Sequence, residues 1–109
     1  MSEKLSFNKY QEDAFELISK EGKKELLTNG VLRLAGESDE CCDIIKKHKY
    51  QGHELNKDDL IEELGDVLWY VVETCSGLDI TLEEVAQRNL DKLHKRYHGT
   101  KFNKNDSIN

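Results

Sequence analysis

Two pairs of acidic residues have types and a spacing that could do chemistry. Glu37 and Glu40 are three residues apart, and so are Glu63 and Asp66. Residues three apart on a helix are neighbours, so each pair would place two negative charges side by side. Carboxylate oxygens favour Mg²⁺, Mn²⁺ or Ca²⁺ over zinc or copper, and protein-bound Mg²⁺ commonly shares its coordination with substrate phosphates. The pairs therefore predict a divalent-cation site suited to phosphoryl chemistry.

Helical periodicity predicts the elements that must position these carboxylates. The sequence has no proline and is rich in Glu, Lys and Leu, which favours helices. Apolar spacing predicts four helices over about 7–27, 31–48, 57–76 and 82–98, with a bend or interruption of the first at Gly22. Breaks are predicted at Asn29-Gly30, at 49–56 and at Gly77. Asn56 is the expected N-cap of the third helix, and Thr81 with Glu84 has the capping-box pattern. Because the connections are short, we expect an all-α antiparallel bundle of about four helices.

The predicted helices would bring the two pairs together. On a helical wheel, each pair lies at the border between the apolar stripe and the polar face. Counted from the connection that the second and third helices share, both pairs lie about 9 to 16 Å along the hairpin at ~1.5 Å per residue. Four carboxylates can then converge at one level, where bound cations would offset their repulsion. The alternative interpretation is two solvated acidic faces.

Composition limits the classes of function and the location. The 109 residues predict one domain over 1–99, followed by a flexible polar tail over 100–109. The net charge of −6, without a basic stripe, does not favour nucleic acid as a partner, and no apolar stretch predicts a membrane span. The N-terminus lacks an apolar signal core, and the three cysteines have no metal-site spacing. We therefore expect a cytoplasmic protein whose cysteines are small core residues.

The segments around the carboxylates resemble a known family. The segments are LAGE at 34–37, EELGDVLWY at 62–70 and the closing helix over 82–97, and they are similar to the MazG-like nucleoside triphosphate pyrophosphohydrolases. The resemblance implies an all-α fold in a homodimer or homotetramer. It also implies Mg²⁺-dependent cleavage of nucleoside triphosphates between the α and β phosphates, with Mn²⁺ as a possible substitute. The products would be a nucleoside monophosphate and pyrophosphate, which suits nucleotide-pool housekeeping.

The same resemblance implies roles for individual residues. Glu37, Glu40, Glu63 and Asp66 become metal ligands. Apart from the resemblance, either pair could supply a carboxylate as general base for a metal-bound water, and Glu40 and Glu63 are the candidates. Residues that would bind the substrate are Lys92 and Arg96 on phosphate, Lys47 on phosphate, and Asn89 on base or sugar. Tyr70 lies on the carboxylate side of its helix, where it could stack on a base, and core packing is the alternative interpretation. Arg33 and Ser38 depart from the small or apolar residues expected at their positions, whereas the acidic frame is intact.

Three other functions share some of these features. A phosphoribosyl-ATP pyrophosphohydrolase would use the same chemistry, so substrate profiling is needed to separate it. A helical partner-binding or regulatory module would not act on nucleotides and would not be stabilised by Mg²⁺. A di-iron carboxylate bundle would need Glu-x-x-His pairs on two helices, and the sequence has none.

Overall fold

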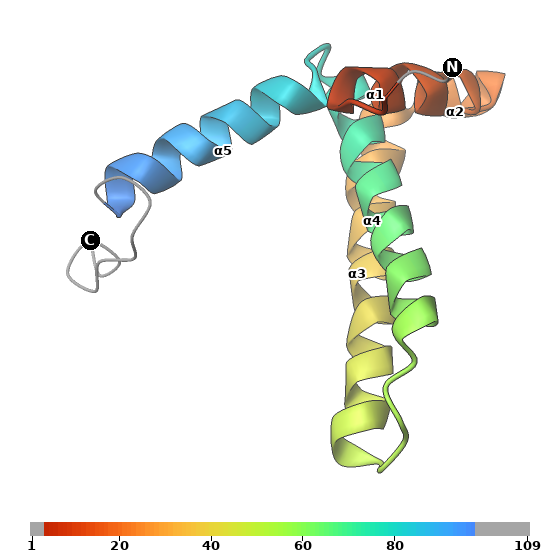
Figure 1. Cartoon of the computed structure of the whole chain (residues 1–109). Helices are drawn as coiled ribbons and strands as arrows, with labels where there is room; N and C mark the ends of the chain where they lie inside the picture. Colours follow the sequence, from red (N-terminus) through yellow and green to blue (C-terminus); the bar gives the residue numbers. More distant parts are fainter. Residues whose placement is uncertain (1–3, 98–109) are drawn as a thin grey trace.

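The computed structural model describes residues 4–97, which form five α-helices and no β-strand (Figure 1). The helices are α1 (Phe7–Glu16), α2 (Lys20–Lys24), α3 (Leu26–Tyr50), α4 (Lys57–Gly77) and α5 (Leu82–Arg96). The predicted all-α class is confirmed. The predicted end of the last helix at His98 and Gly99, and the predicted tail over 100–109, lie outside the described residues.

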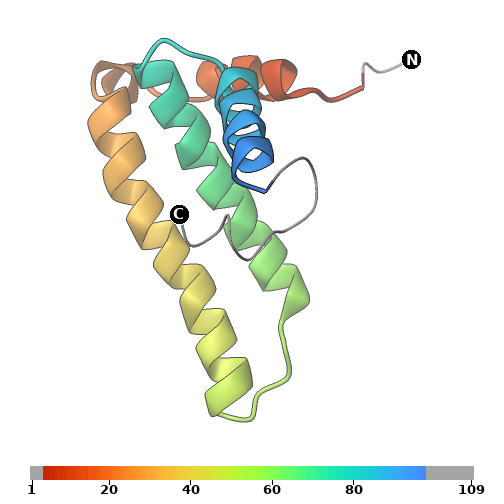
Figure 2. The same cartoon turned by 90° about the vertical axis from the view of Figure 1, so that its left-hand side faces the viewer.

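The dominant feature is a long antiparallel hairpin of α3 and α4. The connection over 51–56 closes its lower end, and α1 and α2 cross its upper end (Figures 1 and 2). Helix α5 begins at the upper end, where it contacts α1 and α4, and then runs away from the hairpin (Figure 1). The helices therefore do not form one parallel-sided bundle within a single chain.

Glycine at the upper end brings α3 and α4 close together. Gly30 is buried inside α3, and a Cβ atom at this position would lie 2.9 Å from the backbone nitrogen of Thr74. A Cβ atom at Gly77 would lie 2.8 Å from the backbone nitrogen of Leu27. The predicted break at Asn29-Gly30 is wrong, because Gly30 serves helix packing and α3 continues through it.

The chain breaks earlier, inside the helix predicted over 7–27. Helix α1 ends at Glu16, and α2 begins after Ser19, whose Oγ accepts a hydrogen bond of 2.9 Å from the Gly22 backbone N–H. Glu25 then separates α2 from α3. Serine satisfies an unpaired donor at a helix N-terminus, so Ser19 favours a new start at this point.

Both predicted N-caps are confirmed. The Asn56 side chain accepts a hydrogen bond of 3.1 Å from the Asp59 N–H at the start of α4. Thr81 Oγ1 accepts one of 3.0 Å from the Glu84 N–H at the start of α5. The Glu84 carboxylate does not complete a capping box, because it accepts from Arg88 one turn further along.

A small core lies where α1, α4 and α5 meet. Ala14, Val72, Cys75 and Leu82 are its buried members. The Gln11 side chain adds a polar link, because its Nε2 donates to the Ile80 carbonyl (2.9 Å) and its Oε1 accepts from the Leu82 N–H (2.8 Å). Helix α1 therefore fixes the point from which α5 leaves.

An apolar stripe on α4 is only half covered. Its members recur every three or four residues, as one face of a helix requires, and they are Ile61, Leu64, Leu68, Val72 and Cys75. Val72 and Cys75 are buried at the upper end, whereas Ile61, Leu64 and Leu68 are 55%, 54% and 38% exposed. Within the described chain, the lower half of the stripe is therefore left largely open to solvent.

The cysteine environments agree only in part with the sequence prediction. Cys75 is buried in the core, Cys41 is half-buried, and Cys42 is exposed. The prediction of a core position is therefore wrong for Cys42.

None of the helices within residues 4–97 combines the length and the apolar character needed to cross a membrane.

Candidate functional site

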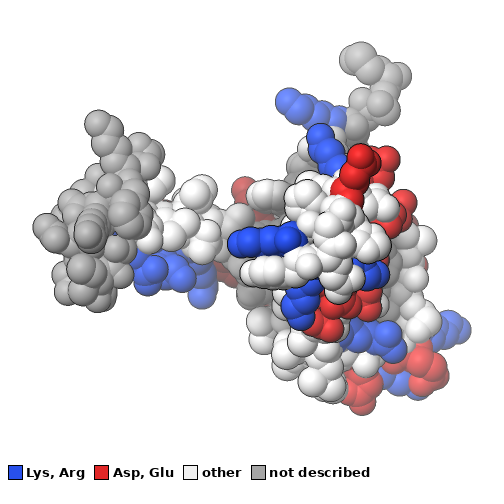
Figure 3. Space-filling model, turned by 90° about the horizontal axis from the view of Figure 1, so that it is seen from below, with Lys and Arg blue, Asp and Glu red and all other residues white. Residues whose placement is uncertain are grey.

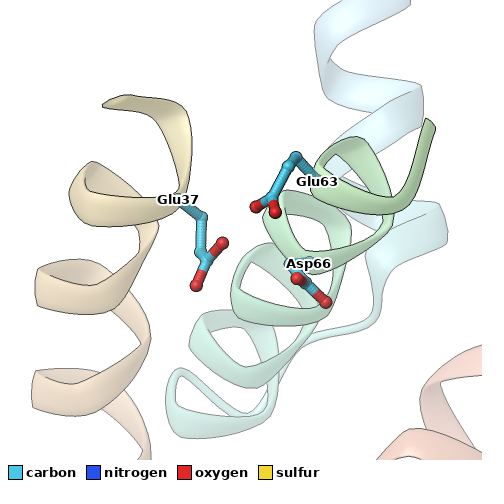
Figure 4. A group of neighbouring side chains, drawn as sticks. All are labelled: Glu37, Glu63 and Asp66. Atoms are coloured by element: carbon cyan, nitrogen blue, oxygen red, sulfur yellow. The ribbon is translucent and has the colours of Figure 1, made fainter. Parts of the chain in front are cut away.

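Three carboxylates converge partway along the hairpin. Glu37 on α3 and Glu63 on α4 point toward each other, and Asp66 lies one turn along α4 (Figure 4). One oxygen from each carboxylate lies within 4.8 Å of the other two. The Gly30–Thr74 contact sets the register: Glu37 lies seven residues below Gly30, and Asp66 eight residues below Thr74. Similar helical rise then places the carboxylates at similar heights.

The electrostatics of this cluster favour a cation. The pKa of Glu63 is raised above its ordinary value, first by a hydrogen bond with the Glu37 side chain and then by burial. Repulsion from Glu37, Asp66 and Glu62 raises this pKa further. Like charges that are held together need a shared proton or a bound cation. Because all three candidate ligands are carboxylates, the cluster fits a hard divalent ion such as Mg²⁺.

Glu40 is not one of the three converging residues. It lies one turn beyond Glu37 on α3, and its side chain is exposed. The structure thus brings together three of the four predicted metal ligands. The role of Glu40, as ligand or as base, stays a prediction.

The predicted substrate-binding residues other than Tyr70 lie away from the carboxylate cluster of their own chain. Lys47 is exposed ten residues beyond Glu37, about 15 Å further along α3. Asn89, Lys92 and Arg96 lie on the part of α5 that runs away from the hairpin (Figure 1). Basic side chains gather on the arm formed by α5, whereas the lower end of the hairpin carries both signs of charge (Figure 3).

Tyr70 lies one turn after Asp66 and lines a pocket of about 230 Å³. Trp69 and Glu73 also line the pocket from α4, and Asn29 and Arg33 line it from α3. The turn between α1 and α2, together with Gly22 of α2, supplies the rest of the wall. Because Arg33 is one turn before Glu37, the pocket adjoins the carboxylate cluster on both helices.

Sequence reasoning missed Glu73, which is the buried charged residue of this pocket. The residue is 5% exposed, and burial raises the pKa of its carboxyl while the charge of Arg33 lowers this pKa in part. A signal was present in the sequence, because Glu73 is the only charged residue between Asp66 and Asp79. A lone charge within an apolar helical segment calls for a structural or functional partner.

Tyr10 is a second neighbour that the sequence analysis did not assign to the site. Burial and the negative charge of Asp66 raise the pKa of its hydroxyl. Tyr10 on α1 is therefore close enough to Asp66 for the charge of the cluster to affect its hydroxyl.

Comparison with known proteins gives an independent result. A family model described as the MazG nucleotide pyrophosphohydrolase domain matches residues 27–100. The chain is also 41% identical over 76 residues to the Gene 37 protein of Mycobacterium phage L5, covering 66% of this chain and 67% of that protein. No solved structure matches the chain. The matched segment includes α3, α4 and the converging carboxylates, and the chain belongs to the MazG nucleotide pyrophosphohydrolase domain family.

Proposed function

We propose that this protein hydrolyses nucleoside or deoxynucleoside triphosphates between the α and β phosphates, with Mg²⁺ or Mn²⁺ as cofactor. The products would be a nucleoside monophosphate and pyrophosphate. The observation that carries this proposal is the convergence of Glu37, Glu63 and Asp66 in a chain of the MazG family. A nucleotide-pool role in the cytoplasm follows from this activity as part of the proposal.

Each acidic residue then has a task. Glu37, Glu63 and Asp66 would hold the divalent ion, which when bound screens the phosphate charges and helps to generate the attacking water. Glu40 lies one turn from Glu37 and would complete the ligand set or accept the proton of the water. Glu63 is the other candidate for the base.

The substrate-binding residues fall into two groups. Tyr70 lines the pocket beside the cluster and offers an aromatic face on which a base could stack. Lys92, Arg96, Asn89 and Lys47 would bind phosphate, base or sugar. Because α5 runs away from its own hairpin, its three residues would serve the site of a neighbouring copy in a homodimer or homotetramer (Figure 1).

The direct test is turnover of each nucleoside triphosphate and deoxynucleoside triphosphate with Mg²⁺, with detection of monophosphate and pyrophosphate. Phosphoribosyl-ATP belongs in the same panel because its cleavage uses the same chemistry. Glu63→Gln should reduce kcat by about 10²–10⁴-fold, since it removes a candidate base and ligand. Glu54→Gln, an exposed residue in the connection below the hairpin, is the matched control and should retain activity.

Thermal unfolding with and without Mg²⁺ separates the candidate roles of Glu40 and Glu63. A residue that serves only as base should lose turnover when changed to Gln but keep the stabilisation by Mg²⁺, whereas a ligand should lose both. Absence of cleavage for every substrate, together with no Mg²⁺-dependent stabilisation, would contradict the enzyme and favour a partner-binding module.

A further inference from the structure

Glu73 is buried, and its carboxylate has no hydrogen-bond partner among the described residues. The residue is 5% exposed, yet within residues 4–97 its carboxylate forms no hydrogen bond or ion pair. The guanidinium of Arg33 influences it only through longer-range charge. A buried carboxylate without a direct partner is costly, so a ligand that supplies a donor would be bound favourably at this position.

The pocket lined by Glu73 suits a flat aromatic ring. Trp69 and Tyr70 contribute aromatic side chains, and Asn29 contributes a half-buried amide. The volume of about 230 Å³ is smaller than that of sites for complete drug-sized ligands, and it suits a ring system such as a nucleobase. Stacking on aromatic rings and hydrogen bonding at the ring edge is the common way in which proteins hold an unpaired base.

The pocket also has a suitable position. Glu73 lies seven residues after Asp66 on α4, which is about 10 Å along the helix axis. Phosphates bound beside Glu37, Glu63 and Asp66 would therefore leave the sugar and base to extend toward the pocket. This placement rests on the proposed function, because it takes the carboxylates as the site that binds phosphate through a cation.

We propose that Glu73 is a specificity-determining residue that accepts a hydrogen bond from the exocyclic amino group of the nucleobase. The preferred bases are those with an amino group at the pyrimidine 4-position or the purine 6-position, namely cytosine and adenine. Uracil and hypoxanthine have a carbonyl oxygen there, and two acceptors facing each other repel. Acidic side chains accept from the cytosine amino group in the same way in nucleic-acid complexes.

The chain provides its own probe for this proposal, because its only tryptophan is Trp69 in the wall of the pocket. We would titrate the full-length protein with dCMP and dUMP, and with dAMP and dIMP, in the presence of Mg²⁺. Within each pair, the amino group is replaced by a carbonyl. Fluorescence of Trp69 reports occupancy of the pocket, and calorimetry gives the affinity without any need for turnover.

Wild-type protein should bind dCMP and dAMP about fivefold or more tightly than their carbonyl counterparts. Glu73→Gln should bring each ratio to within about twofold, because the amide can act as donor or acceptor. Glu73→Ala should also lose the preference, and Glu54→Gln should keep it. A purely structural role would change thermal stability and leave these ratios unchanged.

Several results would overturn the inference. These are equal affinities within each pair in the wild type, a preference that survives in Glu73→Gln, or binding by calorimetry that leaves Trp69 emission unchanged. Failure to bind any of the four monophosphates would overturn it as well. If the preferences are present but no triphosphate is cleaved, the proposed hydrolase activity fails and the assignment of Glu73 stands.

Discussion

Two glutamates on α4 have raised pKa values for different physical reasons. The Glu63 carboxyl is affected first by its neighbour Glu37, whereas the Glu73 carboxyl is affected first by burial. The convergence around Glu63 could be predicted from sequence, because spacing along regular helices fixes both face and height. The environment of Glu73 could not, because it depends on how the turn between α1 and α2 packs against the hairpin.

The raised pKa of Glu73 predicts a pH dependence of stability. Because this pKa is higher in the folded chain than in the unfolded chain, the folded state binds the extra proton. The free energy of unfolding therefore falls as the pH rises above about 4.3, the value for free Glu. Glu73→Gln removes this loss, so relative to wild type it should gain on the order of 1 kcal/mol between about pH 4 and pH 7.

Denaturant unfolding of both proteins across this pH range measures the difference, with Glu54→Gln as the exposed control. A difference that does not change with pH would show that the Glu73 carboxyl does not titrate differently in the two states.

Among the elements, glycine has two opposite uses in α3. Gly30 lies against the backbone of Thr74, whereas a Cβ atom at Gly36 would meet nothing within 4 Å. The sequence predicted the existence of the long helices, because their apolar periodicity is sustained. It did not predict where α3 begins, because a glycine that breaks a helix and a glycine that permits close packing look alike in sequence.

This contrast predicts opposite effects for the same substitution. Gly30→Ala should destabilise the fold by about 1–3 kcal/mol, since the added methyl meets the backbone of α4. Gly36→Ala should stabilise it by about 0.5–1 kcal/mol, because alanine favours the helix and has room. Thermal unfolding of the two variants measures both effects. Equal effects would mean that α3 and α4 are not in close contact at Gly30.

On the scale of the whole molecule, the half-covered stripe on α4 favours assembly. Val72 and Cys75 are buried at its upper end, whereas Ile61, Leu64 and Leu68 continue the same line in the open. Exposed apolar surface that continues a core commonly marks an interface. The family resemblance implied an oligomer, but the face involved could not be predicted, because it depends on which part of the stripe α1 covers.

Ile61→Asp should therefore shift the protein from dimer or tetramer toward monomer, because it places a charge on the exposed stripe. Sedimentation velocity at several concentrations measures the assembly state. Leu5→Asp makes the same kind of change at an exposed position before α1 and should leave assembly unchanged. A wild-type protein that sediments as a monomer at high concentration would contradict the proposed homo-oligomer.

The direction of α5 has a consequence for the activity expected when two different inactive variants are mixed. Its cations Lys92 and Arg96 belong to the helix that runs away from the hairpin carrying Glu37, Glu63 and Asp66 (Figure 1). If those cations hold the substrate, each catalytic centre is a composite of two polypeptides. Two inactive variants, one without Glu63 and one without Lys92 and Arg96, would then recover part of the activity when mixed, because some exchanged pairs contain one intact centre.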